Sequence, residues 1–460
     1  MPAMRGKCTN FGNCQKADSQ EFIDVAPGVS PICPMCQRPL TMVPVARSGP
    51  PVGVIAAVVI ALLVIGILFK VLSGKKESGG TPSMPVATTP PPSSNGPDLG
   101  STPAGTQSDP QVHPGDALMY FERSDEKWLR VAAEDFNKQH ESQPQIVLDF
   151  RGSREGKQDI LYGKGKPVIW NPADTYWVDK LNLDWRNPSV GKHSDDVVGD
   201  SKTILSTRLV LVFWDDRAKV LASAMNRSEY RGKTWQLLYD IATQGWSKAG
   251  GPAAWGKLKL AQTDPTKSNS GQAALALMFS EYTKSNAGAT PSSGGFMKFM
   301  KGVESSVSHF DETTSKSLDV MLKGSHDDID GAVCYETNAL SAVDGHKDIR
   351  IIYPSPTVAI NFPAAVVKAD WVDEGEAKLA NQFIDYLLTP DVQKQALQYG
   401  FRPAIDNMRS DVDNAFSAGD RGSAGFILDP TTVDRPVSTK IVDDLLFQWY
   451  KTYGSGGAAP

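Results

Sequence analysis

The segment 263–271, Thr-Asp-Pro-Thr-Lys-Ser-Asn-Ser-Gly, has the side chains best suited to hold a ligand. It follows a short strand-like run and precedes apolar residues that recur at helical spacing over 272–279. Backbone N–H groups at a helix N-terminus have no partner within the helix, and the hydroxyls of Ser268 and Ser270 add donors. The pattern predicts a polar cradle for an anion or another oxygen-rich ligand. Capping of the helix by one of these serines is the alternative interpretation.

Four of the five cysteines, Cys8, Cys14, Cys33 and Cys36, lie near the N-terminus and have metal-ligand chemistry. Thiolates at the spacing of Cys33 and Cys36 can reach one tetrahedral zinc ion, and so short a segment holds no apolar core without a cross-link. Residues 1–45 therefore resemble a zinc ribbon with one structural zinc. Cys8 and Cys14 are too far apart in sequence for the usual ribbon spacing, so two disulfides are the alternative.

A membrane anchor is expected next. Residues 52–69 carry no charge, and at about 1.5 Å per residue such a run just crosses a hydrocarbon core of roughly 30 Å. We predict a transmembrane helix at 50–73, followed at 74–115 by a disordered tether rich in Pro, Ser and Gly. Because reduced thiolates belong in the cytosol, we expect the N-terminus inside the cell and the large C-terminal domain outside. The flanking positive charge slightly favours the opposite orientation, but large domains translocate with little regard for it.

Beyond the tether, strand-like segments alternate with helix-like segments. The runs 117–121 and 146–150 are typical of strands, and each is followed by a turn and an amphipathic helix. This repetition predicts parallel α/β layers, in which ligands collect at the carboxyl ends of the strands. Ser124, Ser153 and Arg154 lie at those ends and are candidate ligand residues, with helix capping and simple solvation as the alternatives.

From residue 116 to 455 the order of segments resembles the type II periplasmic solute-binding proteins, the two-lobed α/β receptors of transport systems. The likeness is strongest to the extracellular solute-binding proteins often joined to von Willebrand A domains. No such module follows the helix-like 441–453 here, so none of its functions is expected. The resemblance is carried by 168–177, Gly245-Trp246, Trp255-Gly256, the turn at 263–271 and Tyr335-Glu336.

The resemblance implies two discontinuous lobes, about 116–207 with 355–455 and about 208–354, and a ligand cleft along their seam. The apolar strand 206–215 is similar to the segment by which these receptors cross into the second lobe. Carried over to this sequence, the ligand contacts are Ser124, Ser153 and Arg154 in the first lobe and Ser268, Asn269, Ser270 and Tyr335 in the second.

The implied function is a membrane-anchored extracytoplasmic protein that captures a small polar or anionic solute by hinge closure. Its partner would be a membrane transporter or a signalling protein. The alternative is a sensor or assembly protein that uses the receptor fold to bind a protein. A measurable affinity for a small solute distinguishes the first function from the second.

Other classes of function are disfavoured. The net charge of −5 argues against a nucleic-acid binder that relies on phosphate contacts. The segment 163–166 lacks the phosphate-loop pattern, and the acidic run 326–331 lacks the later glutamate of a calcium loop, so an exposed acidic turn is expected there. Cys334 lies in an apolar strand, which predicts a buried, inert thiol. No assembled catalytic site is evident, so we expect no enzyme.

Overall fold

The computed structural model describes residues 4–8, 14–18, 22–25, 31–36, 38, 40–43, 110–191 and 193–454. The predicted transmembrane helix at 50–73 lies outside these residues, and so does the predicted tether up to residue 109. None of the helices in the described part of the chain is long and apolar enough to cross a membrane.

The N-terminal segment forms a small antiparallel sheet in the order β2-β1-β3 with one short helix. These elements are β1 (Met4–Lys7), α1 (Gln15–Asp18), β2 (Phe22–Val25) and β3 (Thr41–Val43). Besides cysteines, the described buried apolar side chains of the segment are Ala17, Val25 and Leu40. So few buried apolar side chains do not stabilise a fold without a cross-link. The prediction of a metal site in this segment rests on the same argument.

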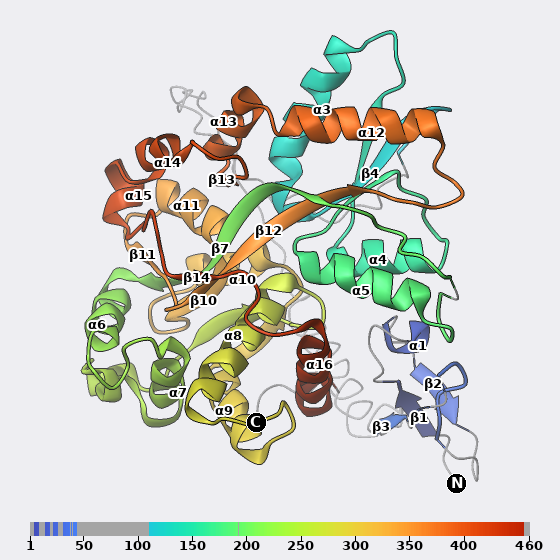
Figure 1. Cartoon of the computed structure of the whole chain (residues 1–460). Helices are drawn as coiled ribbons and strands as arrows, with labels where there is room; N and C mark the ends of the chain where they lie inside the picture. The colour runs from blue at the N-terminus through green and yellow to red at the C-terminus, as the bar shows by residue number, and fades with distance from the viewer. Residues whose placement is uncertain are drawn as a thin grey trace, which may run out of the picture. The chain divides into compact units, whose positions relative to one another are not determined.

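The large domain is built on one continuous mixed sheet flanked by helices (Figure 1). The strand order is β5-β4-β6-β12-β7-β10-β8-β9, with β11 and β13 paired to β7 and β14 paired to β12. The strands are β4 (Ala117–Phe121), β5 (Ile146–Phe150), β6 (Ile169–Asn171), β7 (Lys202–Trp214), β8 (Leu260–Thr263), β9 (Val307–Asp311), β10 (Gly331–Tyr335), β11 (Ile349–Ile352), β12 (Thr357–Val366), β13 (Arg402–Pro403) and β14 (Thr432–Val433).

We call the part of the domain around β5-β4-β6 the first lobe. These three strands are parallel, as the strand–turn–helix repetition predicts. The α3 helix buries one face, from Trp128 to Phe136, against the sheet, which accounts for its apolar periodicity. The helices of this lobe are α3 (Glu126–Gln139), α4 (Ser153–Leu161), α5 (Thr175–Arg186), α12 (Glu374–Leu387) and α13 (Pro390–Gln398).

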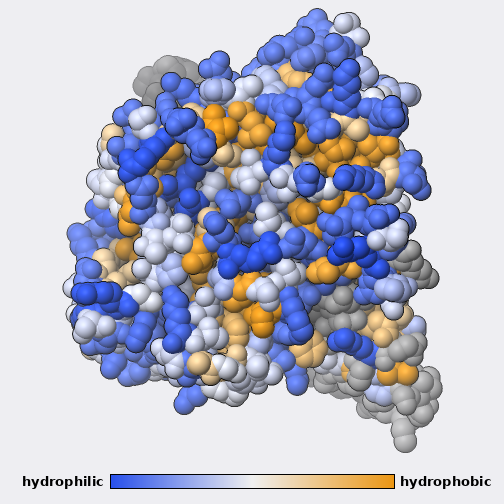
Figure 2. Space-filling view, in the orientation of Figure 1, coloured by the Kyte–Doolittle hydropathy of each residue, from blue (hydrophilic) through white to orange (hydrophobic). Residues whose placement is uncertain are grey.

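We call the part around β10-β8-β9 the second lobe. Here β8 runs parallel to both β10 and β9. Its helices are α6 (Asp215–Met225), α7 (Thr234–Gln244), α8 (Asn269–Ser285), α9 (Gly294–Glu304), α10 (Thr314–Lys323) and α11 (Glu336–Gly345). The C-terminal helices are α14 (Arg409–Phe416), α15 (Gly419–Ser423) and α16 (Thr439–Tyr453). Figure 2 shows a mostly hydrophilic face of the molecule, as expected when the apolar side chains fill the two cores.

Strands β7 and β12 carry the chain between the lobes (Figure 1). The N-terminal half of β7 pairs with β12, from Lys202 opposite Ala364 to Arg208 opposite Ala359. Its C-terminal half, from Leu209, pairs with β10 of the second lobe. The register of β12 shifts beside Pro363, a residue without the N–H that a regular ladder requires.

The C-terminal helix α16 contacts both lobes (Figure 1). The Asp443 carboxylate accepts hydrogen bonds from the Tyr176 hydroxyl at 2.8 Å and from Lys180 Nζ at 2.9 Å, both on α5. On the other side, the Trp449 ring packs edge-on against Phe310 of β9, with 5.0 Å between ring centres. The position of α16 is therefore fixed by the first and the second lobe together.

A buried ion pair joins the second lobe to the chain that follows α13. Arg402 of β13 donates from Nε and Nη2 to the two carboxylate oxygens of Glu336 on α11, at 2.6 and 2.7 Å. The Tyr353 hydroxyl donates to the same carboxylate at 2.5 Å. Both charged side chains are almost fully buried, so each depends on the other for its charge to be tolerated.

Replacing Arg402 by methionine should therefore destabilise the intact protein strongly. Loss of one member of a buried ion pair typically lowers the free energy of unfolding by about 3–5 kcal/mol, because the other charge stays buried alone. The control is Arg409→Met, which breaks an exposed pair with Asp429 and should cost at most about 1 kcal/mol. Urea unfolding measures both. Similar losses of unfolding free energy in the two variants would show that the buried Arg402–Glu336 pair contributes no more to stability than an exposed pair.

Candidate functional site

Side chains of the two lobes meet directly between α5 and α8. The Trp177 indole of α5 donates from Nε1 to Asn269 Oδ1 of α8 at 3.2 Å, and both side chains are buried. The Asn269 side chain also interacts with the hydroxyl of Tyr335, at the carboxyl end of β10. Burial raises the pKa of Tyr335, and the nearby carboxylates of Glu122 and Asp174 raise it further. The contact is thus a closed, polar and partly acidic seam.

A carboxylate of the protein itself occupies the N-terminus of α4. Glu122 Oε2 accepts hydrogen bonds from the Ser153 N–H at 2.9 Å and from the Ser153 hydroxyl at 2.5 Å. The same hydroxyl oxygen accepts from the Ala173 N–H at 2.9 Å. Burial raises the pKa of Glu122, although these hydrogen bonds oppose the shift. A ligand anion that used Ser153 would have to displace this carboxylate.

The hydroxyls at the start of α8 bond to one another. Ser270 is fully buried, and its Oγ lies 2.9 Å from Thr263 Oγ1 and 2.8 Å from Thr314 Oγ1. Ser268 is the N-cap residue, but its side chain makes no capping hydrogen bond and lies 3.3 Å from Ser270 Oγ. A Cβ on Gly271 would lie 2.5 Å from the Thr263 carbonyl oxygen, so only glycine allows α8 to start this close to β8. The cluster therefore holds α8 against β8 and α10.

The seven predicted ligand residues fall into three places. Ser268, Asn269 and Ser270 are together at the start of α8, and Tyr335 reaches Asn269 from β10. Ser153 and Arg154 begin α4. Ser124 lies in the short η1 helix (Arg123–Asp125); it is not the N-cap of α3, because that position belongs to Asp125.

A cavity of about 40 Å³ opens beside the Trp177–Asn269 contact. Gln272 lines it, is 5% exposed, and its Oε1 has no hydrogen-bond partner in the described part of the chain. Asp174 caps α5 by accepting from the Tyr176 N–H at 2.8 Å, and burial raises the pKa of Asp174 to about 6. The polar lining comprises Asp174, Tyr176, Asn269, Gln272, Asp434, Arg435 and Thr439.

Gln272 and Asp174 line the cavity without having been predicted as ligand residues, although the sequence carries a signal for each. Gln272 lies one helical turn after Asn269 and therefore faces the same side of α8. Asp174 precedes the helix-like segment 175–186 in the position of an N-cap.

Asp125 is a buried carboxyl near the same edge of the first lobe. It has no exposed surface, and neither of its carboxyl oxygens has a hydrogen bond among the described residues. Burial raises the pKa of Asp125 well above its usual range, and the charge of Glu122 adds to the shift.

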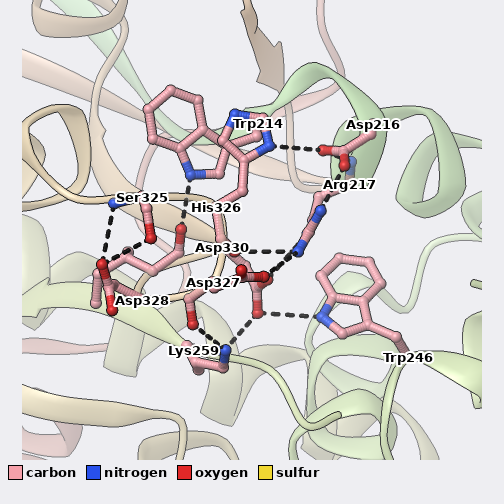
Figure 3. A network of polar contacts seen from close by, with 11 residues as sticks. Trp214, Asp216, Arg217, Trp246, Lys259, Ser325, His326, Asp327, Asp328 and Asp330 are labelled. Atoms are coloured by element: carbon pink, nitrogen blue, oxygen red, sulfur yellow. Dashed lines mark hydrogen bonds and ion pairs between the residues drawn. The ribbon is translucent and has the colours of Figure 1, made fainter. Parts of the chain in front are cut away.

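The acidic turn before β10 forms a structural network (Figure 3). Asp330 is fully buried, and its carboxylate accepts from Arg217 Nε at 3.2 Å, Trp246 Nε1 at 3.1 Å and the Lys259 N–H at 2.8 Å. The expectation of an exposed turn is right for Asp327, whose side chain is 97% exposed, and wrong for Asp330. The error arose because the partners of Asp330 lie 71 to 113 residues away in the sequence.

The four N-terminal cysteines converge on one point. Their sulfur atoms all lie within 4.8 Å of one another, with 3.4 Å between Cys8 and Cys36 and 3.6 Å between Cys14 and Cys33. None of them forms a disulfide. Tetrahedral zinc–sulfur bonds of about 2.3 Å place the sulfurs about 3.8 Å apart, so the four thiols fit one metal ion. Cys334, by contrast, is fully buried in β10, as predicted.

Comparison with known proteins identifies the family. Residues 120–402 match the family described as bacterial extracellular solute-binding proteins. The chain belongs to this family. The predicted two-lobed α/β fold of periplasmic binding proteins is thereby confirmed. A sulfate-binding protein of Synechococcus elongatus is 27% identical over 109 residues, which cover 24% of this chain and 30% of that protein.

Several solved structures are similar to the chain at low sequence identity. The sulfate-binding protein SubI from Mycobacterium tuberculosis is 17% identical, with a TM-score of 0.45 over 74% of this chain and 96% of its own. A ferric binding protein from Campylobacter jejuni is 12% identical, with a TM-score of 0.49 over 74% of this chain and 99% of its own. Iron-bound HitA from Pseudomonas aeruginosa is 14% identical, with a TM-score of 0.48 over 75% of this chain and 100% of its own. The assignment to the family rests on the family match.

The buried carboxyl of Asp125 predicts a specific pH dependence. Because its pKa is higher in the folded than in the unfolded chain, the folded state binds more protons, and stability falls as the pH rises above about 4. Asp125→Asn should remove the loss of stability that Asp125 causes as the pH rises. This variant should therefore be more stable than the native protein at pH 8. The control is Asp327→Asn, which is almost fully exposed. Urea midpoints from pH 4 to 8 test this, and parallel curves for Asp125→Asn and the native protein would refute it.

Proposed function

We propose that this protein captures a small polar solute between its lobes outside the cytoplasm and delivers it to a membrane transporter. The family match supplies solute binding. The observation that supports capture between the lobes is the Trp177–Asn269 hydrogen bond, a direct link across the seam beside a cavity. An enzyme is disfavoured because proteins of this family bind solutes.

Hinge closure is the proposed mechanism. The proposed lobes are 116–207 with 355–455 and 208–354, and bending of β7 and β12 where they cross between the lobes would open the seam. Contacts that a ligand makes to both lobes favour the closed form, because binding shifts the equilibrium toward the state with more contacts. The Trp177–Asn269 bond would form only on closure and would add to that preference.

The proposed function also includes an anchor that attaches the receptor domain to the membrane. A transmembrane helix at 50–73 would hold the receptor outside the membrane and the cysteine segment in the cytoplasm. A flexible chain over 74–115 has an r.m.s. end-to-end distance of roughly 35 Å, enough for the receptor to reach a neighbouring transporter. The likeness to receptors joined to von Willebrand A domains stays a prediction.

A second candidate function is supported by the small size of the cavity. A volume of about 40 Å³ leaves little room for a solute in this closed arrangement. A receptor fold that signals or assembles through a protein partner needs no larger space. The two functions differ in whether a small molecule binds at all.

Native mass spectrometry of the intact protein tests the proposed function. We expect a retained small molecule and a smaller retained fraction in Trp177→Phe, which loses the hydrogen bond across the seam. A neutral hydrogen bond is worth about 0.5–1.5 kcal/mol, so affinity should fall roughly 2–10-fold. The control is Trp371→Phe, which loses a comparable bond from Nε1 to the Pro167 carbonyl within the first lobe. If the protein retains no small molecule and no added solute stabilises it, the result would favour a sensor or assembly protein that binds a protein partner.

We further propose that Cys8, Cys14, Cys33 and Cys36 hold one structural zinc ion. Metal analysis of protein purified under reducing conditions should find about one zinc per chain. Cys14→Ser should lose most of it, because three thiolates bind the ion less tightly. The control Cys334→Ser should retain it, since that thiol lies in β10 of the large domain. Less than about half an equivalent in the native protein would contradict the zinc site.

A further inference from the structure

The polar atoms that usually hold an oxyanion are already committed at this seam. The Ser153 N–H and hydroxyl donate to Glu122, and the Ser270 hydroxyl bonds within the α8 cluster. Arg435 at the cavity rim donates to Asp179 at 2.6 Å and to Thr175 Oγ1 at 3.2 Å. An anion entering the seam would have to replace these internal partners.

Two amide atoms of the described cavity lining have no hydrogen-bond partner, the acceptor Gln272 Oε1 and the donor Asn269 Nδ2. The Trp177 N–H can only donate, so the Asn269 atom that it meets is the carbonyl Oδ1. The Gln272 Nε2 also points at Asn269 Oδ1, at 3.4 Å, and this orients the Gln272 carbonyl Oε1 away from Asn269. This Oε1 is unpartnered among the described residues, on a side chain that is 95% buried and lines the cavity. An unmet acceptor in such a place calls for a donor.

The net charge of the residues that line the cavity also favours a ligand that donates hydrogen bonds. Two carboxylates line the cavity, Asp174 and Asp434, against one guanidinium, Arg435, which is already paired with Asp179. Glu122 adds a further carboxylate close to Tyr335. Arg154 lies near Tyr176 but is not one of the described residues that line the cavity. The lining is therefore net negative and attracts positive charge.

We propose that this cavity binds the ammonium group of an amine-bearing solute, cationic or zwitterionic, with Asp174 and Gln272 Oε1 as its acceptors. A primary ammonium has three donors, which a carboxylate and an amide carbonyl satisfy, and a charge-assisted bond is stronger than a neutral one. The volume exceeds the roughly 10–15 Å³ that one water needs, and Ala273, Ala276 and Val358 provide apolar walls for the carbon next to the nitrogen. The assignment rests on the proposed function and narrows its solute.

Calorimetric titration of the intact protein tests this, with methylammonium, ethanolamine, putrescine and glycine as amine probes and sodium sulfate as the anion, at constant ionic strength. At least one amine probe should bind and sulfate should not. Gln272→Leu removes the acceptor at similar volume, and Asp174→Asn removes the charge but keeps a residue that caps α5. Each should weaken amine binding about tenfold or more.

The matched control is Gln395→Leu on α13. Gln395 also has an Oε1 without a partner among the described residues, but it does not line the cavity, so amine affinity should not change. Amine binding that survives both cavity substitutions would overturn the assignment, because the site would lie elsewhere.

The mass of any molecule retained in the native protein separates this inference from the proposed function. A retained molecule with an amine supports both. A retained molecule without an amine, or binding of sulfate in place of the amines, overturns the ammonium site and leaves solute capture standing. If no molecule is retained and no probe binds, solute capture fails as well.

Discussion

Both lobes depend on the pairing of β7. This strand is buried along nearly its whole length, so its backbone groups need partners on both sides. β12 and β13 supply them on the first half, and β10 and β11 on the second. The two lobes are therefore parts of one hydrogen-bonded sheet, and the proposed hinge closure would have to bend its shared strands. Any change that exposes β7 affects both cores at once.

The polar character of the seam follows from the side chains of the protein that pair with one another at the N-termini of α4 and α8. A helix N-terminus favours a negative charge, and at α4 the protein supplies one from Glu122. At α8 the hydroxyls of Ser270, Thr263 and Thr314 satisfy one another. With these donors used internally, the unpartnered amide atoms of the described cavity lining are Gln272 Oε1 and Asn269 Nδ2, and Asp174 and Asp434 add two carboxyls.

A chain of buried charges connects the C-terminal helix to the same seam. Lys157 contacts Asp184 at 2.6 Å, Asp184 contacts Lys180 at 3.1 Å, and Lys180 reaches Asp443 of α16 at 2.9 Å. Each ammonium has a carboxylate beside it, which makes burial of the charges tolerable. The α5 helix that carries Lys180 also carries Trp177, so one helix contacts both α16 and the start of α8.

The sequence by itself determined the layered α/β architecture, because the 2-residue and 3.6-residue periods of apolar side chains depend only on local order. It also predicted a shared role for the four N-terminal cysteines, and the structure brings their sulfur atoms within 4.8 Å of one another. Which polar groups are free for a ligand was decided only by the tertiary structure. Glu122 and Ser153 are 31 residues apart, and Ser270 and Thr314 are 44 apart. Hydrogen-bond partners so distant in sequence leave no local pattern, so the turn at 263–271 could be recognised as polar but not as already satisfied.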